Sequence, residues 1–173
     1  MENMTLYWSV LDLKDWKLHM AAGDRGLVFI GSHNGPFEEL ADWVNRRMPG
    51  WKLVRHDEKL ASAADQIKAY LQGESERFNV PLDLHGTPFQ LAVWNALLQI
   101  PYGHTQSYAD IALRVGKPSA VRAVGAAIGA NPLLIVVPCH RAIGKNGALT
   151  GYRGGLEMKK RLLQLEQQAL PIR

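Results

Sequence analysis

The chain has 173 residues, of which 47% are hydrophobic and 21% are charged, a composition that is typical of globular proteins and excludes a disordered one. Its apolar runs are far shorter than the roughly 20 residues of a membrane helix, and it begins without the basic-then-apolar order of a signal peptide, so we expect a cytoplasmic protein that does not enter a membrane. The single cysteine excludes an internal disulfide and a cysteine-rich zinc site.

The net charge of +4 conceals a difference between the two halves of the chain. Residues 1–85 carry 10 Lys and Arg against 13 Asp and Glu, whereas residues 86–173 carry 10 against 3. A basic half joined to an acidic half suggests that the second half meets a polyanion. An uneven surface without such a partner explains the charges equally well.

The first half of the chain predicts a small α/β unit. Short runs rich in aromatic and β-branched residues predict strands, and apolar residues at helical spacing predict helices. The strands are expected at residues 5–11, 16–21, 26–32 and 51–55, and the helices at residues 36–47 and 60–71. An extended segment at residues 80–84 ends at His85-Gly86, where we place the boundary between domains 1–85 and 86–173.

The second half predicts mainly helices. Two capping boxes, in which a Ser or Thr is followed three residues later by a side chain that bonds back, predict helix starts at Thr87 and Ser107. After a tight turn, Ser119 is expected to cap a third helix that runs through Gly129. Two short helices around such a turn have the form of a helix-turn-helix.

The third of these helices consists almost entirely of small residues. Val121, Val124 and Ile128 are expected to face the core, and the other positions are alanine and glycine apart from Arg122. Small side chains with a lone arginine suit close approach to a narrow groove of DNA. A fully buried helix whose arginine forms an ion pair has the same composition, and composition alone favours this second interpretation slightly.

The cysteine follows a compact apolar run, residues 134–137, that predicts a buried strand. In Pro138-Cys139-His140-Arg141 the adjacent histidine and arginine are residue types that favour a thiolate. Neighbouring side chains of an extended segment point in opposite directions, so Cys139 and His140 need a bend or a bridging water to act together. From this dipeptide alone, a buried structural cysteine and a reactive nucleophile are equally supported.

The residues around Cys139 resemble those of a known family. Pro138-Cys139-His140-Arg141 is the signature of the methylated-DNA–protein-cysteine methyltransferases, or O6-alkylguanine-DNA alkyltransferases, and the chain looks most like their short, stand-alone Bacillus-type members. Further elements stand in the order and spacing of that family: Tyr102-Gly103, Ser107-Tyr108-Ala109, Ala120-Val121-Arg122-Ala123-Val124-Gly125, Asn131-Pro132, Gly151-Tyr152-Arg153-Gly154-Gly155 and Leu162-Leu163-Gln164-Leu165-Glu166. The resemblance is strong over residues 86–168 and holds in outline for the first half.

The resemblance implies a fold of the α+β or α/β class, with a small ribonuclease-H-like N-terminal domain and a helical C-terminal domain that contains a winged-helix-like helix-turn-helix. It implies direct-reversal DNA repair, in which the protein takes the alkyl group of O6-methylguanine, and of O4-methylthymine, irreversibly and once. The expected partner is double-stranded DNA with such a base flipped out, bound through the minor groove by a monomer. No cofactor is implied, and no metal, because the zinc of some relatives depends on cysteines that this chain lacks.

The same resemblance assigns catalytic roles. Cys139 is expected to be the nucleophile and His140 its general base through a bound water, with Glu166 orienting and charge-stabilising His140. Asn131 is expected to hold the recognition helix against the active-site turn, and Tyr108 to reach the extruded guanine and the adjacent phosphate. Without the resemblance, Glu166 is a half-exposed carboxylate at a helix end, Asn131 part of an ordinary turn, and Tyr108 a core aromatic.

Further positions are assigned to DNA and to the base pocket. Contacts to DNA are expected from Ala120, Val121, Arg122, Gly125 and Arg141, and the base pocket is expected to be lined by Tyr108, Ala142, Leu149, Tyr152, Arg153 and Gly154. Arg122 is expected to fill the gap left by the extruded nucleotide, and the Arg153 amide to donate to O6. The run Lys159-Lys160-Arg161 is interpreted as a solvated or phosphate-facing helix start.

Three other functions remain as alternatives. An alkyltransferase-like binding module marks lesions without removing the alkyl group, but such proteins lack the cysteine at this position. A helix-turn-helix transcription factor needs outward polar side chains that read bases, and the third helix supplies almost none. A Cys-His-Glu hydrolase would turn over an acyl substrate without DNA, which leaves the basic half and Arg122 unexplained.

Overall fold

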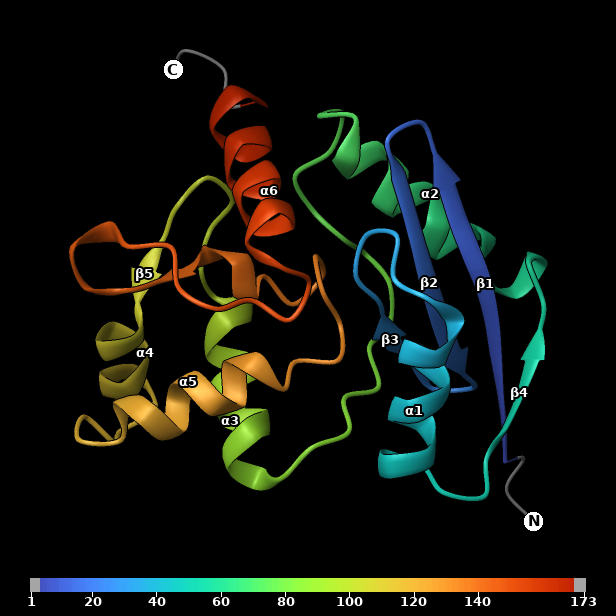
Figure 1. Ribbon diagram of the computed structural model, residues 1–173, viewed down its shortest axis with the longest axis horizontal. Helices are drawn as coiled ribbons and strands as arrows, with labels where there is room; N and C mark the ends of the chain where they lie inside the picture. Colours follow the sequence, from blue (N-terminus) through green and yellow to red (C-terminus); the bar gives the residue numbers. More distant parts are fainter. Residues whose placement is uncertain (1–3, 170–173) are drawn as a thin grey trace. The chain divides into compact units, whose positions relative to one another are not determined.

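The computed structural model describes residues 4–169, and the chain divides into two compact units, the first ending at His85 and the second beginning at Gly86. Figure 1 traces the first unit from blue to green and the second from green to red. Within residues 4–169, no helix combines the length and the apolar character that crossing a membrane requires.

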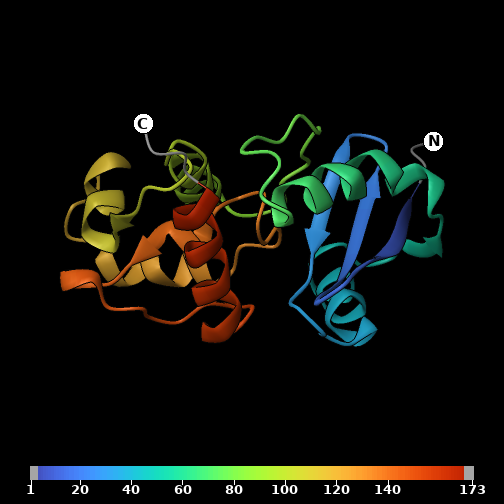
Figure 2. The same ribbon diagram turned by 90° about the horizontal axis from the view of Figure 1, so that it is seen from above.

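The first unit is a four-stranded sheet with a helix on each face (Figure 2). Its strand order is β3-β2-β1-β4, in which β1, β2 and β3 form an antiparallel meander and β4 lies parallel to β1. The elements are β1 (Thr5–Leu13), β2 (Trp16–Gly23), β3 (Gly26–Ile30), α1 (Phe37–Arg47), β4 (Lys52–Arg55), the 3-10 helix η1 (Glu58–Leu60) and α2 (Ala61–Leu71). Apart from η1, these are the strands and helices predicted from the spacing of apolar residues.

Apolar side chains fill both faces of this sheet. On one face Leu6 and Val28 of the strands pack with Leu40 and Val44 of α1. On the opposite face α2 packs against β1 and buries Ile67 completely. Because both faces are covered, the strands are apolar on both sides where they cross the centre of the unit.

The extended segment that closes the first unit is bound to β3. Leu27 donates its amide to the Pro81 carbonyl at 2.9 Å and accepts from the Asp83 amide at 2.8 Å. Gly26 has a φ of +144°, and a Cβ there would lie 2.5 Å from the Pro81 carbonyl oxygen. The close approach of the two backbones therefore requires glycine.

The second unit is mainly helical. Its elements are α3 (Pro88–Leu98), β5 (Gln106–Ser107), α4 (Tyr108–Arg114), α5 (Val121–Gly129), the 3-10 helix η2 (Cys139–Arg141), β6 (Ala142–Ile143), the 3-10 helix η3 (Lys145–Gly147) and α6 (Leu156–Ala169). Helices α3, α4 and α5 pack on one another, and Trp94 of α3 donates its indole N–H to the Ala127 carbonyl of α5 at 2.8 Å. The short strands β5 and β6 pair in parallel and bring the start of α4 beside the segment that follows Cys139.

Both predicted capping boxes are confirmed. The side chains of Thr87 and Ser107 accept from the backbone of the third helical residue, whose own side chain bonds back in each case. The predicted cap of α5 is wrong, because Ala120 rather than Ser119 precedes the helix and no side chain caps it. Val121 is 36% exposed, so it does not face the core as Val124 and Ile128 do.

The strand predicted at residues 134–137 is also wrong. These residues are fully or almost fully buried, as the apolar run indicates, but they form consecutive turns rather than a strand. Ile135 has a φ of +73°, a conformation that costs a β-branched residue roughly 1–3 kcal/mol. Burial was predicted correctly and geometry was not, because an apolar run carries no information about which partner satisfies its backbone.

Candidate active site

Cys139 begins the 3-10 turn η2 and lies in the interior of the second unit. It is 2% exposed, and its amide donates to the Val137 carbonyl at 2.7 Å. The Ala142 amide in turn bonds to the Cys139 carbonyl and ends the turn. This 3-10 turn supplies the bend that an extended Cys139-His140 pair would lack.

Asn131 holds the turns that precede Cys139. Its side chain is completely buried, accepts from the Leu133 amide at 3.0 Å and donates to the Val137 carbonyl at 2.9 Å. One side chain thus binds both ends of the strained segment around Ile135. Since Asn131 lies two residues after the end of α5, these bonds also connect the end of that helix to the backbone that carries Cys139.

The carboxylate of Glu166 is the centre of a buried polar cluster. It is 1% exposed, its Oε2 lies 2.7 Å from Nε2 of His140, and its Oε1 accepts from the Gly103 amide at 3.1 Å. Burial raises the pKa of this carboxyl, but hydrogen bonds from His140 and Arg141 outweigh burial and hold the pKa well below its usual range. Glu166 is therefore a charged side chain inside the unit rather than a half-exposed helix-end carboxylate.

Arg141 is buried in the second unit, which speaks against the contact with DNA that the resemblance implies. The side chain is buried, and Nε and Nη2 each donate to the Glu166 carboxylate at 2.9 Å. Nη1 donates to the Ile100 carbonyl at 2.7 Å, and the guanidinium lies over the ring of Tyr102. Since each terminal nitrogen already donates inside the protein, Arg141 serves as the counter-ion of Glu166.

Lys159 is also buried, which contradicts its assignment to a solvated helix start. Its Nζ donates to the carbonyls of Ala142 at 2.6 Å and Thr150 at 3.2 Å, and the residue is 0% exposed. Burial lowers the pKa of this ammonium, whereas the charge of the Cys139 sulfur raises it. A cation therefore acts on the sulfur from α6.

The ionisation of Cys139 and His140 explains why the cysteine needs a base. Burial raises the pKa of the thiol, and the Asn131 side chain, Arg153 and Lys159 oppose this rise only in part. Burial lowers the pKa of His140, so its imidazole is neutral near pH 7. Because a carboxylate only accepts hydrogen bonds, the neutral ring carries its proton on Nε2 and leaves Nδ1 as the basic nitrogen.

Tyr108, at the first position of α4, is held by the glycine-rich loop between β6 and α6. Thr150 of that loop donates to its hydroxyl oxygen, and the Lys159 ammonium lies 6.0 Å from the centre of its ring. The Tyr108 hydroxyl accepts in this contact, so its own proton stays available for a bond to another group. Thr150 was not singled out by sequence reasoning, because a threonine in a glycine-rich loop has no distinctive pattern.

The predicted pocket residues of the loop do not all lie together. Arg153 donates from Nε to the Asn131 carbonyl at 2.9 Å, which ties the loop to the turns that carry Cys139. Tyr152 has a buried hydroxyl, and Gly154 lies against the Tyr152 ring. Ala142 is fully buried, and its carbonyl already accepts one bond from Lys159.

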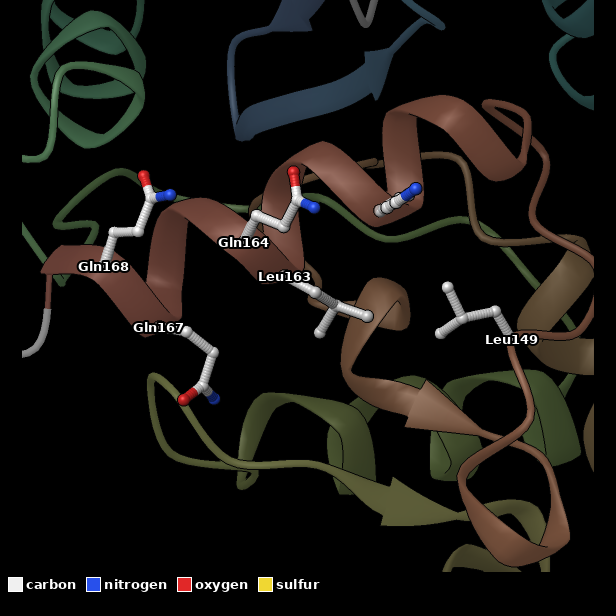
Figure 3. A pocket seen from close by; sticks show the side chains of 6 residues that line it. Leu149, Leu163, Gln164, Gln167 and Gln168 are labelled. Atoms are coloured by element: carbon white, nitrogen blue, oxygen red, sulfur yellow. The ribbon is translucent and has the colours of Figure 1, made fainter.

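Leu149 is 41% exposed and lines a different pocket (Figure 3). This pocket has a volume of about 400 Å³, and Figure 3 shows Leu149 opposite Leu163 of α6. The remaining lining residues are Lys160, Gln164, Gln167 and Gln168. Leu149 thus lines a recess on α6 rather than a space shared with Cys139.

The DNA-facing residues predicted on α5 form an open surface. Arg122, Ala123, Ala126 and Gly129 are exposed, Ala120 and Gly125 are partly exposed, and Val121 borders them. A Cβ built on Gly125 or Gly129 would meet no atom within 4 Å. Internal packing therefore does not require small residues here, and the interpretation of a fully buried helix with an ion-paired arginine is excluded.

The helical spacing of α6 indicates that Lys159 is buried, although the run of charges around it suggests the opposite. Lys159, Leu162 and Glu166 stand at positions i, i+3 and i+7 of α6, which is the spacing of one helix face. Because Lys159 begins the run Lys159-Lys160-Arg161, its charge was interpreted as solvated. No sequence pattern distinguishes Arg141 as a buried partner of Glu166, since that contact joins segments 25 residues apart.

Comparison with known proteins covers almost the whole chain. Two family models match: "6-O-methylguanine DNA methyltransferase, ribonuclease-like domain" over residues 6–84, and "6-O-methylguanine DNA methyltransferase, DNA binding domain" over residues 88–168. The chain is 61% identical over 165 residues to the inducible methylated-DNA–protein-cysteine methyltransferase of Bacillus subtilis strain 168, covering 95% of this chain and 92% of that protein.

Solved structures agree with these matches. The crystal structure of the Mycobacterium tuberculosis O6-methylguanine methyltransferase is 40% identical in sequence, with a TM-score of 0.82 and coverage of 97% of this chain and 96% of that chain. A structure described as Mycobacterium tuberculosis OGT in complex with DNA matches with the same identity and coverage and a TM-score of 0.77. The predicted fold, an N-terminal ribonuclease-like domain and a helical DNA-binding domain, is confirmed.

The contacts of Arg141 lead to a prediction about stability. Replacing Arg141 by Met leaves the Glu166 carboxylate buried without its cation, so we expect the free energy of unfolding to fall by about 3 kcal/mol or more. Urea denaturation followed by circular dichroism measures the change. Arg114→Met, at an exposed position of α4, serves as the control and is expected to change stability by less than about 0.5 kcal/mol. If Arg141→Met kept its stability but bound DNA more weakly, the result would contradict this structural role and support a contact of Arg141 with DNA.

Proposed function

The chain belongs to the methylated-DNA–protein-cysteine methyltransferases, and we propose that Cys139 is the residue that receives the alkyl group. The function is direct-reversal DNA repair by alkyl transfer to a cysteine of the protein itself. One observation carries the assignment of the acceptor: the chain has a single cysteine, and it lies buried beside the His140–Glu166 pair. The product is S-alkylcysteine, a thioether that water does not readily hydrolyse, so each molecule reacts once.

The reaction is a displacement at the alkyl carbon of O6-methylguanine, and of O4-methylthymine. The Cys139 sulfur forms a bond to the methyl carbon while the bond from that carbon to the base oxygen breaks and its electron pair passes to the base. A buried thiol of raised pKa is a poor nucleophile, so it must lose its proton first. His140 accepts that proton at Nδ1 through a bridging water, and Glu166 stabilises the imidazolium that results.

Asn131 and Tyr108 complete the proposed site. Asn131 acts by positioning, because its hydrogen bonds connect the end of α5 to the turns before Cys139. Tyr108 retains a hydroxyl proton and donates a hydrogen bond to the departing base, which stabilises the charge that develops there. The Arg153 amide donates to the base oxygen, and the carbonyls of Cys139 and Ala142 accept from the exocyclic amine of guanine.

The surface of α5 supports binding of double-stranded DNA through the minor groove. Glycine inside a helix costs about 1 kcal/mol relative to alanine, yet Gly125, in the middle of α5, has open space where a side chain would lie. Gly129, at the end of α5, has the same open space. A small face that internal packing does not require is explained by close approach of the DNA backbone from outside. Arg122, exposed among these small residues, occupies the gap that the extruded nucleotide leaves, and a monomer suffices for these contacts.

Intact mass measurement tests the proposed acceptor. After incubation with a duplex that contains one O6-methylguanine, we expect the protein to gain one methyl group, at Cys139 by peptide mapping, without turnover. Cys139→Ala is expected to abolish transfer and to leave duplex binding largely intact, since the DNA-facing surface lies on α5. An unmodified wild-type protein that still binds the lesion would indicate the binding module instead.

A second experiment tests the role of Arg122. Arg122→Ala removes the side chain that replaces the extruded nucleotide, so we expect the single-turnover rate on duplex DNA to fall about tenfold or more while affinity changes less. A single-stranded oligonucleotide with the same base needs no extrusion from a stack and serves as the control, on which the rate should be unchanged. Equal rates on duplex for the variant and the wild type would contradict this role.

A third experiment tests the small face of α5. Ala126→Leu adds bulk at an exposed position and is expected to weaken duplex binding about tenfold or more, because the DNA backbone can no longer approach closely. Its stability should change by less than about 0.5 kcal/mol. Ala92→Leu, at an exposed position of α3, is the matched control and should bind DNA like the wild type. Equal affinities of the two variants, measured by fluorescence anisotropy, would argue against this face.

A further inference from the structure

The loop between β6 and α6, residues 144–155, has a backbone with little preference for one conformation. Five of its twelve residues are glycine, the residue that loses the most conformational freedom when a chain becomes ordered. Tyr152, Arg153 and Gly154, which are predicted to line the base pocket, all lie in this loop. Bonds from side chains therefore matter for where this part of the loop lies relative to Cys139.

Arg153 joins this loop to the turns that precede Cys139. Its Nε donates to the Asn131 carbonyl at 2.9 Å, and its Nη2 donates to the Pro132 carbonyl at 3.2 Å. The side chain is partly buried, and a charged donor forms a stronger hydrogen bond than a neutral one. Because the guanidinium is planar and rigid, two bonds from one such group fix its orientation as well as its distance.

Asn131 continues this connection to the proposed nucleophile. Its side chain donates to the Val137 carbonyl at 2.9 Å, and the Cys139 amide donates to the same carbonyl at 2.7 Å. A series of hydrogen bonds through Asn131 thus links the Arg153 guanidinium to the backbone of Cys139. The part of the loop around Arg153 can move away from these turns only if the Arg153 side chain changes its conformation or gives up its bonds.

Two further bonds hold the same loop at a different point. Thr150 donates to the Tyr108 hydroxyl at the start of α4, and Lys159 of α6 donates to the Thr150 carbonyl at 3.2 Å. Both contacts hold the loop at Thr150. The bonds of Arg153 hold it three residues later, between Tyr152 and Gly154, and they are the ones that lead to the segment carrying Cys139.

We propose that Arg153 is a specificity-determining residue, whose side chain keeps the loop at a fixed distance from Cys139 and thereby favours small alkyl groups over large ones. The inference rests on the proposed function of Cys139 as the alkyl acceptor, with this loop as a wall of the base pocket. A larger group on O6 needs more room between the base and the sulfur, so the wall must move and release the Arg153 bonds. A methyl group needs no such movement. In both cases the sulfur forms a bond to the alkyl carbon while the bond from that carbon to the base oxygen breaks.

The variant Arg153→Met tests this role, because it retains a long side chain and removes both donors. Two duplexes of the same sequence carry either O6-methylguanine or O6-benzylguanine, whose benzyl carbon is itself reactive in displacement. The ratio of the single-turnover rates, benzyl over methyl, is expected to rise about tenfold in Arg153→Met, as for the loss of a hydrogen bond to a charged group. Lys145→Met, at an exposed cation of the same loop, is the matched control and should leave the ratio unchanged.

A purely structural role for Arg153 would lower both rates by the same factor, so an unchanged ratio overturns the proposal. The single cysteine allows a second readout without DNA, namely the relative rates at which Cys139 reacts with iodoacetamide and with the larger N-benzyliodoacetamide. This ratio should shift toward the larger reagent in Arg153→Met and not in Lys145→Met. It tests Arg153 even if the wild-type protein transfers no methyl group, a result that would contradict the proposed function alone.

A second variant covers the case in which Arg153→Met does not fold. Arg153→Lys keeps the charge but replaces the rigid fork of donors by a single flexible ammonium. Both ratios should then shift in the same direction as expected for Arg153→Met, and unshifted ratios would overturn the proposal.

Discussion

The ion pair between Glu166 and Arg141 is the interaction on which the rest of the site depends. A buried carboxylate is stable only when it is paired and hydrogen-bonded, and Glu166 receives bonds from the Arg141 guanidinium, the His140 ring and the Gly103 backbone. These partners come from η2 and from the connection after α3. One charge therefore joins α6 to the elements that precede it and determines which nitrogen of His140 is basic.

A second constraint is the conformation of the backbone before Cys139. The positive φ of Ile135 is unfavourable for a β-branched residue, and it persists because Asn131 binds both ends of the segment. The same segment delivers Cys139 into a buried position where its pKa is raised. The strain at Ile135 opposes stability, so the surrounding hydrogen bonds hold a geometry that local preferences alone would not adopt.

The sequence predicts those features that depend on local pattern. Capping boxes at Thr87 and Ser107 and the apolar spacing of the first unit correctly indicated where elements begin and which side is buried. The strand expected at residues 134–137 does not form, because the Asn131 side chain binds backbone groups of this segment that a neighbouring strand would otherwise bind. The sequence predicts a DNA contact for Arg141 and a solvated or phosphate-facing Lys159, because a cation is normally exposed. Only the fold reveals the distant groups that each one binds.

In the second half of the chain, the residues around Cys139 and the residues of α5 differ in how the protein itself stabilises them. Around Cys139, polar groups such as Asn131 and Glu166 are buried and satisfied, which is the arrangement that gives a rigid, preorganised site. Along α5, the partly exposed Gly125 lowers helix stability and no internal neighbour requires it. The helix α5 is thus less stable than an alanine-containing helix would be. The proposed function explains this, because the DNA backbone packs against the small face of α5 from outside. In the proposed function the cysteine is reached by moving the substrate base into the protein, since Cys139 is 2% exposed.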